Sequence, residues 1–331
     1  MKNKLDIGRL ILGNLKLAGI MKNAHKHYAK IESAAELRLK QLDYSSDLVF
    51  TNKNLSFIES YKKNFFTFLM ISILDNMKIP KERVILYGEI TFCLRGIVTA
   101  TDNIIDNEKK GVIFLNDVEN SVVNNTLLLM TLQNVLLHVL NELGCSEKGM
   151  TLILNKIHSI AKSESLRNSA LYDKYPAPQY IIDNIHTGIG GELLQLALWI
   201  PEIMEGLSSP VSEYNKALFD IGMALQALDD LCDMSEDFSA SQVNLGISVL
   251  KYQYDTQYNP SVNPVAAAYP EMCKNYSYNC INTALTGFNK LSELGYPLSR
   301  NDSLVLLQYL FELRGIKDLW EISEFHKKKS K

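Results

Sequence analysis

Apolar residues recur every three or four positions through most of the chain, which is the spacing that places them on one face of an α-helix. Alternating Val, Ile and Thr runs bounded by Asn-Gly or Asp-Gly turns, which would predict β-hairpins, are absent from the sequence. We therefore expect an all-α helical bundle of about ten helices. The predicted helices run from Ile31 to Leu42, Leu55 to Met77, Lys81 to Asn107, Ser121 to Leu143, Lys148 to Asn168, Ala177 to Leu198, Ser212 to Phe238, Val265 to Leu294 and Ser299 to Gly315.

The connections between these segments are short, and no Pro/Ser-rich linker or change in composition divides the chain. One domain over residues 1–331, with its core at about 55–315, is the simplest interpretation. The segment from Gln242 to Pro264 carries three tyrosines and two prolines and predicts a long loop. The first 23 residues predict a helix of the mature protein, because Arg9 and Lys16 interrupt their apolar run.

Charge and cysteine content narrow the class of partner. The chain has 34 Lys and Arg against 37 Asp and Glu, a net charge of −3, so we expect no general affinity for nucleic acid. No window reaches the 18 or more uninterrupted apolar residues that a membrane span needs. The five cysteines contain no CxxC pair, which predicts neither a zinc site nor a disulfide framework and fits a reducing cytoplasm.

Two acidic segments end two strongly apolar helical stretches. In the first acidic segment, Asp102 to Glu108, Asp102 and Asp106 stand four residues apart and share one helical face. In the second acidic segment, Asp229 to Asp237, aspartates recur at four-residue steps toward a helix C-terminus, where the macrodipole also disfavours negative charge. No Lys or Arg lies within four residues of the second stack. A divalent cation would supply the missing positive charge, and an all-carboxylate donor set favours Mg²⁺.

These segments resemble two motifs of the class I isoprenoid synthase superfamily. The residues from Asp102 to Asp106 are similar to its first DDxxD motif, with Asn103 in place of the second aspartate. The stretch from Gly222 to Asp233, including Gln226, is similar to the second motif. Its continuation through Glu236 and Asp237 also resembles the squalene/phytoene synthase branch.

The resemblance implies helices around a central apolar cavity, with the two acidic segments facing each other at its mouth. It also implies three Mg²⁺ ions that hold a prenyl diphosphate, and a homodimer. The implied metal ligands are Asp102, Asp106, Asp229, Asp230, Asp233 and Asp237, of which Asp102, Asp106, Asp229 and Asp233 are the implied catalytic residues. The implied substrate-binding residues are Lys62, Arg95, Lys109, Lys110, His186 and Gln226.

Departures from the prenyl diphosphate synthase pattern separate the subfamilies. The GKRxRP stretch that binds isopentenyl diphosphate in those enzymes corresponds here to Tyr61 to Phe66, and Arg95 stands where they have His or Gln. Their Lys-Thr pair is His186-Thr187 in this chain. These losses favour a terpene synthase, a lyase that ionises one C15 or C20 prenyl diphosphate and cyclises or rearranges the cation.

Three alternatives stay open. A chain-elongating prenyltransferase would need Lys62, Lys63 and Arg95 to bind a second diphosphate. A head-to-head condensing enzyme would fit the acidic spacing through Asp237. A non-catalytic subunit would fit the break that Asn103 makes in the first motif.

Overall fold

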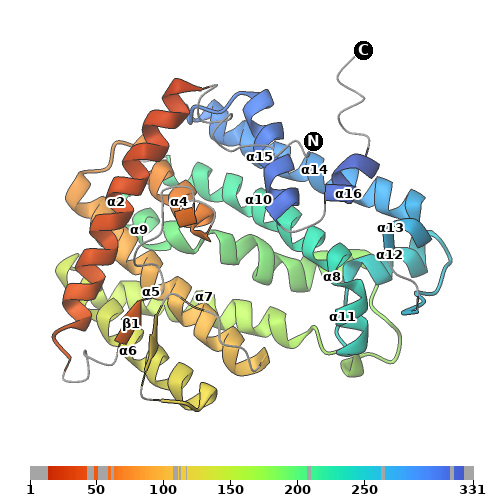
Figure 1. Ribbon diagram of the computed structural model, residues 1–331, viewed down its shortest axis with the longest axis horizontal. Helices are drawn as coiled ribbons and strands as arrows, with labels where there is room; N and C mark the ends of the chain where they lie inside the picture. Colours follow the sequence, from red (N-terminus) through yellow and green to blue (C-terminus); the bar gives the residue numbers. More distant parts are fainter. Residues whose placement is uncertain are drawn as a thin grey trace. The chain divides into compact units, whose positions relative to one another are not determined.

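The computed structural model describes residues 14–42, 48–50, 59–60, 63–106, 111, 113–116, 118–206, 210–261, 265–313 and 317–323. The described residues are mostly helical, which confirms the all-α prediction (Figure 1). They form two compact units. Unit 1 comprises residues 1–15, 154–195 and 212–331, and unit 2 comprises residues 16–153 and 196–211. One domain over 1–331 stays a prediction.

Unit 2 is built around two long helices that pack extensively on each other, α5 and α6. Its helices are α2 (Leu15–Leu39), α4 (Phe65–Asn76), α5 (Lys81–Asp106), α6 (Ser121–Glu142), the first part of α7 (Ser146–Ser165), the 3₁₀-helix η4 (Leu196–Leu198) and α9 (Trp199–Glu205). The strands β1 (Leu48–Phe50) and β2 (Ile113–Leu115) form a short antiparallel ribbon with Leu48 opposite Leu115. The sequence pattern did not predict this ribbon, because a three-residue strand is too short for a period of two to register.

Two ion pairs of Arg38 join three helices of unit 2. Arg38 on α2 donates from Nε to Glu89 Oε2 at 2.6 Å and from Nη2 to Glu142 Oε2 at 2.7 Å. Glu89 on α5 is 1% exposed. Burial raises the pKa of the Glu89 carboxyl, and Arg38 opposes that rise. The cation that pairs with Glu89 is therefore Arg38.

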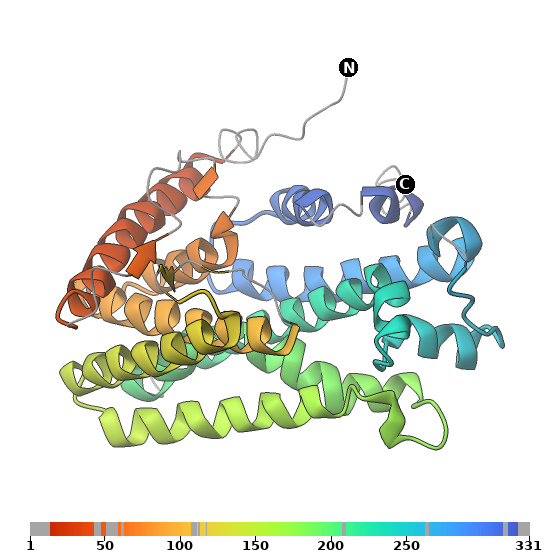
Figure 2. The same cartoon turned by 60° about the horizontal axis from the view of Figure 1, so that its bottom comes forward.

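Unit 1 contains the second part of α7 and the remaining helices. These are the 3₁₀-helix η2 (Ser169–Leu171), α8 (Pro178–Ile181), the π-helix η3 (Ile182–Glu192), α10 (Val211–Cys232), α11 (Met234–Ser239), α12 (Leu245–Gln253), α13 (Val265–Ala268), α14 (Pro270–Glu293), α15 (Arg300–Leu313) and α16 (Lys317–Ile322). Helices α10 and α14 run side by side, with Gly287 of α14 against the backbone of α10 (Figures 1 and 2).

Several predicted elements differ from the structure. The predicted helix from Val265 to Leu294 is divided at Tyr269 into α13 and α14. The predicted helix from Ala177 to Leu198 is broken into α8, η3 and η4. The predicted helix from Ser212 to Phe238 stops at Cys232, and Asp233 caps the separate helix α11. The loop predicted from Gln242 to Pro264 is wrong for its first half, which holds α12. Of the predicted N-terminal helix, the described part is the start of α2 at Leu15.

Two helices, α5 and α6, are long and apolar enough to span a membrane by length and composition alone. In α5 56% of the apolar window is buried in the protein, and in α6 39% is buried. The two helices pack against each other, as core helices of a folded unit do, so this is weak evidence for a span.

Glycines allow α10 and the π-helix η3 to approach backbone to backbone. A Cβ at Gly190 would lie 2.9 Å from the Gly222 carbonyl oxygen, and a Cβ at Gly222 would fall on the Gly190 carbonyl oxygen. A side chain at either position would therefore force the two helices apart. This approach fixes η3 against the half of α10 that leads into the second acidic segment.

We predict that Gly222→Ala lowers the free energy of unfolding by about 2 kcal/mol, because overpacking against backbone has no flexible side chain to absorb it. Gly19→Ala is the control, since a Cβ at Gly19 on α2 meets nothing within 4 Å. The control should raise stability by about 0.5 to 1 kcal/mol through helix propensity. Urea denaturation measures both, and equal effects would contradict the close packing of η3 on α10.

Candidate functional site

The carboxylate of Asp230 is buried and fully engaged by protein groups. It is 3% exposed, and Oδ2 accepts from the backbone N–H of Leu245 at 2.6 Å. His186 Nε2 lies 3.0 Å from the same oxygen, and Gln226 Nε2 donates to Oδ1 at 3.0 Å. These contacts fix the end of α10 to η3 and α12. The structure thus places His186 and Gln226, two expected substrate-binding residues, against Asp230.

Asp237 on α11 is likewise buried and paired. Arg167 Nη2 donates to Asp237 Oδ1 at 3.0 Å, and Asn244 Nδ2 donates to Oδ2 at 2.7 Å. Burial raises the pKa of the Asp237 carboxyl to about 6, while Asn244 and Arg167 hold it from rising further. Arg167 therefore supplies positive charge that the sequence lacked nearby. Sequence reasoning missed it because 70 residues separate the partners.

Asn244 joins the two buried aspartates. Its Nδ2 also donates to the Asp230 backbone carbonyl at 2.6 Å, and its Oδ1 caps α12 by accepting from the Ile247 N–H. The Asn244 N–H donates to the Tyr175 hydroxyl at 2.7 Å. An asparagine just before an apolar helical run is an N-cap signal, so the start of α12 was readable from the sequence.

Asp229 and Asp233 differ from their buried neighbours. Asp229 is half-buried and Asp233 is exposed. Partial desolvation, and then the negative charges of Glu236 and Asp230, raise the pKa of the Asp233 carboxyl. A nearby divalent cation would favour its ionised form. The donor set at this end of α10 therefore suits a hard cation with oxygen ligands.

The first acidic segment lies at the end of α5. Asp102 is exposed, whereas Asn103 is 3% exposed and donates from Nδ2 to Asn125 Oδ1 at 3.1 Å. Asn125 in turn donates from Nδ2 to the Ser121 carbonyl. An ionised aspartate at position 103 could not donate to Asn125. The departure from the DDxxD pattern thus fits a buried amide pair between α5 and α6. Asp106 is the last residue of α5, and its side chain, like Lys62, Lys109 and Lys110, lies outside the described residues.

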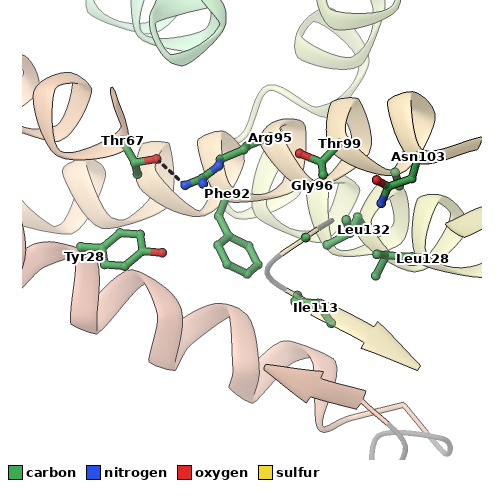
Figure 3. Close-up of a pocket in the computed structure, with 12 residues that line it drawn as sticks. Tyr28, Thr67, Phe92, Arg95, Gly96, Thr99, Asn103, Ile113, Leu128 and Leu132 are labelled. Atoms are coloured by element: carbon green, nitrogen blue, oxygen red, sulfur yellow. Dashed lines mark hydrogen bonds between the residues drawn. The ribbon is translucent and has the colours of Figure 1, made fainter. Parts of the chain in front are cut away.

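Arg95 lines a small pocket of unit 2 (Figure 3). It lies on α5, seven residues before Asp102. Its Nη1 donates to Asn64 Oδ1 at 2.7 Å and to Thr67 Oγ1 at 3.0 Å, and its Nη2 donates to the Lys63 carbonyl at 3.3 Å. Among the described residues no carboxylate hydrogen-bonds this guanidinium. Burial lowers the pKa of Arg95, and the nearby Tyr28 and Glu32 oppose that decrease.

More donors gather beside Arg95. The side chain of Lys63 is close enough that Arg95, after burial, lowers the pKa of its ammonium group. Asn64 is 1% exposed, and its Nδ2 is a buried donor without an acceptor in the described part of the chain. The cavity here is about 20 Å³, room for about one water molecule. The arrangement favours an anion at its edge.

No three His, Cys, Asp or Glu side chains within the described ranges lie close enough together to hold one metal ion. The side chain of Asp106 lies outside those ranges. The facing of the two acidic segments, which belong to different units, stays a prediction.

Comparison with known proteins shows similarity in fold and none in sequence. No known sequence family matches the chain, and no curated protein is similar to it in sequence. A decaprenyl diphosphate synthase from Rhodobacter capsulatus has a TM-score of 0.58 at 13% identity, covering 93% of this chain and 98% of its own. A geranyltranstransferase from Thermotoga maritima has a TM-score of 0.53 at 14% identity, covering 88% and 98%.

A third solved structure holds ligands. It is a polyprenyl synthase from Caulobacter crescentus CB15 complexed with calcium and isoprenyl diphosphate, with a TM-score of 0.55 at 12% identity, covering 93% of this chain and 97% of its own. The similarity to these proteins extends over most of each chain, and it establishes the fold.

We predict that Arg167→Leu destabilises unit 1 by about 3 to 5 kcal/mol at pH 7, because it leaves the ionised Asp237 buried without its cation. The folded pKa of Asp237, about 6, lies above its ordinary 3.8. The folded state therefore binds this proton more tightly, and the group's contribution to stability falls as pH rises between about 4 and 6. At pH 5 protonation removes the buried charge, so the loss should be smaller than at pH 7.

Urea denaturation of both proteins at the two pH values measures this difference. Lys216→Leu is the control, because Lys216 and Glu213 form an ion pair in which both side chains are exposed. We expect the control to change stability by less than about 0.5 kcal/mol. A loss for Arg167→Leu that is equal at both pH values would show that Arg167 does not hold Asp237.

Proposed function

The chain has the all-α fold of the class I isoprenoid synthases, and on that premise we propose that it is a prenyltransferase acting on prenyl diphosphates. In the proposed reaction the allylic C–O bond of one diphosphate breaks and a C–C bond forms to the double bond of isopentenyl diphosphate. Diphosphate and a proton leave. The chain-elongating alternative thus takes precedence over the terpene synthase that the sequence favoured, because the structural neighbours are named as prenyl-chain synthases and transferases.

The arrangement around Arg95 is the observation that supports elongation best. Loss of the GKRxRP pattern had suggested that a second diphosphate site was missing. Arg95 nevertheless hydrogen-bonds Asn64 and the Lys63 carbonyl at the edge of its small pocket, where its guanidinium and the Asn64 amide donor can bind an anion. Such charge-assisted donors suit a diphosphate. We propose that they bind the diphosphate of the isopentenyl substrate.

We propose Mg²⁺ as the cofactor, held by Asp102, Asp106, Asp229 and Asp233. When bound, it would neutralise the charge that develops on the leaving diphosphate. Asp230 and Asp237 drop out of the ligand set of the proposal, because protein donors already occupy their oxygens. Their role is to hold the end of α10 and the start of α11, so that Asp229 and Asp233 keep a fixed spacing.

The remaining chain groups act by position and by exclusion of water. Arg95 and Asn64 orient the diphosphate of the second substrate at the edge of the pocket. Phe92 lines the same pocket and points into it (Figure 3), where an apolar wall would keep water from a reactive cation. Lys109 and Lys110 remain proposed partners of the first diphosphate, on the strength of the sequence resemblance.

Incubation of the purified protein with Mg²⁺ and an allylic diphosphate tests the proposal. We expect geranyl, farnesyl or geranylgeranyl diphosphate to be lengthened by five-carbon steps only when isopentenyl diphosphate is present. Hydrocarbon formed without isopentenyl diphosphate would instead support the terpene synthase. A product joined from two allylic substrates would support the head-to-head reaction. The absence of product with every substrate would favour a non-catalytic subunit.

We predict that Arg95→Met raises the KM for isopentenyl diphosphate at least about tenfold, the usual cost of one charge-assisted hydrogen bond. The KM for the allylic substrate should change little. Arg83→Met is the matched control on the same helix, because Arg83 pairs with Glu205 at 3.2 Å and does not line the Arg95 pocket. Steady-state kinetics with each substrate varied in turn separates the two. Equal effects on both KM values would argue against a dedicated isopentenyl site.

We further propose that the chain forms a homodimer through α6. From Ser121 to Asn141 this helix carries no Asp, Glu, Lys or Arg. Its exposed side includes Leu127 at 41% and Met130 at 64% exposure, together with Val122, Val123 and Leu137. An uncharged, largely apolar helix face of this length is typical of an interface between subunits.

Leu127→Asp should convert the dimer to a monomer, because it would bury a charge in the proposed interface. Light scattering coupled to size-exclusion chromatography measures the mass. Leu37→Asp, at an exposed leucine on α2, is the control and should leave the dimer intact. A measured mass of one chain for the wild-type protein would contradict the proposed homodimer.

A further inference from the structure

A cavity of about 250 Å³ lies inside unit 1, away from the acidic side of α10. Its walls come from α8 and η3, α10, α12 and α14, and α12 contacts both α8 and α14. On α10 the wall consists of Met223, Ala224 and Ala227. At about 100° per residue, Asp229 lies about 140° around the helix from Ala224 and about 160° from Ala227. The cavity therefore opens on a different face of α10 from the Asp229 carboxylate.

The small side chains of Ala224 and Ala227 leave the space that the cavity occupies. Opposite them, Met272, Tyr276 and Cys280 stand four residues apart on α14 and form a buried, largely apolar floor. The volume is just below the range of about 300 to 1,000 Å³ typical of pockets for drug-sized ligands. A small molecule therefore fits in this space.

The rim of the cavity is polar and uncharged. Asn275, Asn279 and Thr283 form an exposed row on α14, and Gln253 of α12 completes it. Amide and hydroxyl groups can donate to or accept from one polar group of a ligand. The cavity is thus apolar inside and hydrogen-bonding at its mouth.

The lining residues of this cavity include no Asp, Glu, Lys or Arg. Burial raises the pKa of the Tyr276 hydroxyl and of the Cys280 thiol, so both groups stay neutral at pH 7. A diphosphate would lie here without a cation, at a large desolvation cost. Charge complementarity therefore selects an uncharged ligand.

We propose that this cavity binds a small, neutral, largely apolar molecule that carries one hydroxyl or carbonyl group, at a site separate from the one for diphosphates. The binding does not depend on the proposed prenyltransferase reaction. His186 forms part of the wall and contacts Asp230 at 3.0 Å. A ligand in the cavity would touch the residue that holds the second acidic segment.

The test uses geraniol, a ten-carbon alcohol, as the probe and isothermal titration calorimetry on the full chain. We expect saturable binding that excess geranyl diphosphate with Mg²⁺ does not displace. Thr283→Phe should weaken binding at least about tenfold, because a ring at the rim covers the mouth and loses the ligand's contacts.

Thr286→Phe is a matched control. Both threonines are exposed on α14, and each donates from Oγ1 to the carbonyl four residues earlier at 3.1 Å, but Thr286 does not line the cavity. Ala227→Leu, which fills the cavity from α10, should also weaken binding, with circular dichroism to verify the fold. The absence of saturable binding, equal affinities of the two threonine variants, or displacement by geranyl diphosphate would each overturn the proposal.

Discussion

The negative charge at the C-terminal end of α10 is the constraint on which the rest of unit 1 depends. Repulsion and the helix macrodipole both oppose a row of carboxylates there. Asp230 and Asp237 are buried, and each accepts hydrogen bonds from protein donors. Arg167 is the cation that pairs with Asp237, and the Asn244 side chain donates to both aspartates. That network draws η3, α11 and α12 together. It leaves Asp229 and Asp233 as the carboxylates suited to an external cation.

Helical periodicity was enough to predict the fold class and several helices almost to the residue. The predicted helices starting at Lys81 and Ser121 match α5 and α6, because each has a clear start signal and an uninterrupted apolar face. Periodicity failed where tertiary contacts decide the backbone. The π-helix η3 depends on the close approach of Gly190 to Gly222, and no local pattern encodes a partner more than 30 residues away.

The sequence predicted which segments form the candidate site. It did not predict which of their carboxylates are buried by protein contacts and which are left to bind a metal ion. The acidic spacing identified both segments, yet all six aspartates were named as metal ligands. Burial separates them, and burial depends on Leu245 and Arg167, which are distant in sequence. Asn103 departs from the DDxxD pattern, and its side chain hydrogen-bonds Asn125 of the next helix. Arg95 was named from the family resemblance, but no sequence signal marks the Asn64 amide beside it, whose Nδ2 has no acceptor among the described residues.

The central claim is that the second acidic segment divides into structural and metal-binding carboxylates. Electron paramagnetic resonance of Mn²⁺, titrated in the presence of inorganic diphosphate, measures this division directly in single Asp→Asn variants. The account predicts that Asp229→Asn and Asp233→Asn each weaken Mn²⁺ binding at least about tenfold without loss of stability. Asp230→Asn should lower the melting temperature and leave the affinity within about threefold of wild type. The reverse pattern, with the metal lost at Asp230 and retained at Asp233, would contradict the account.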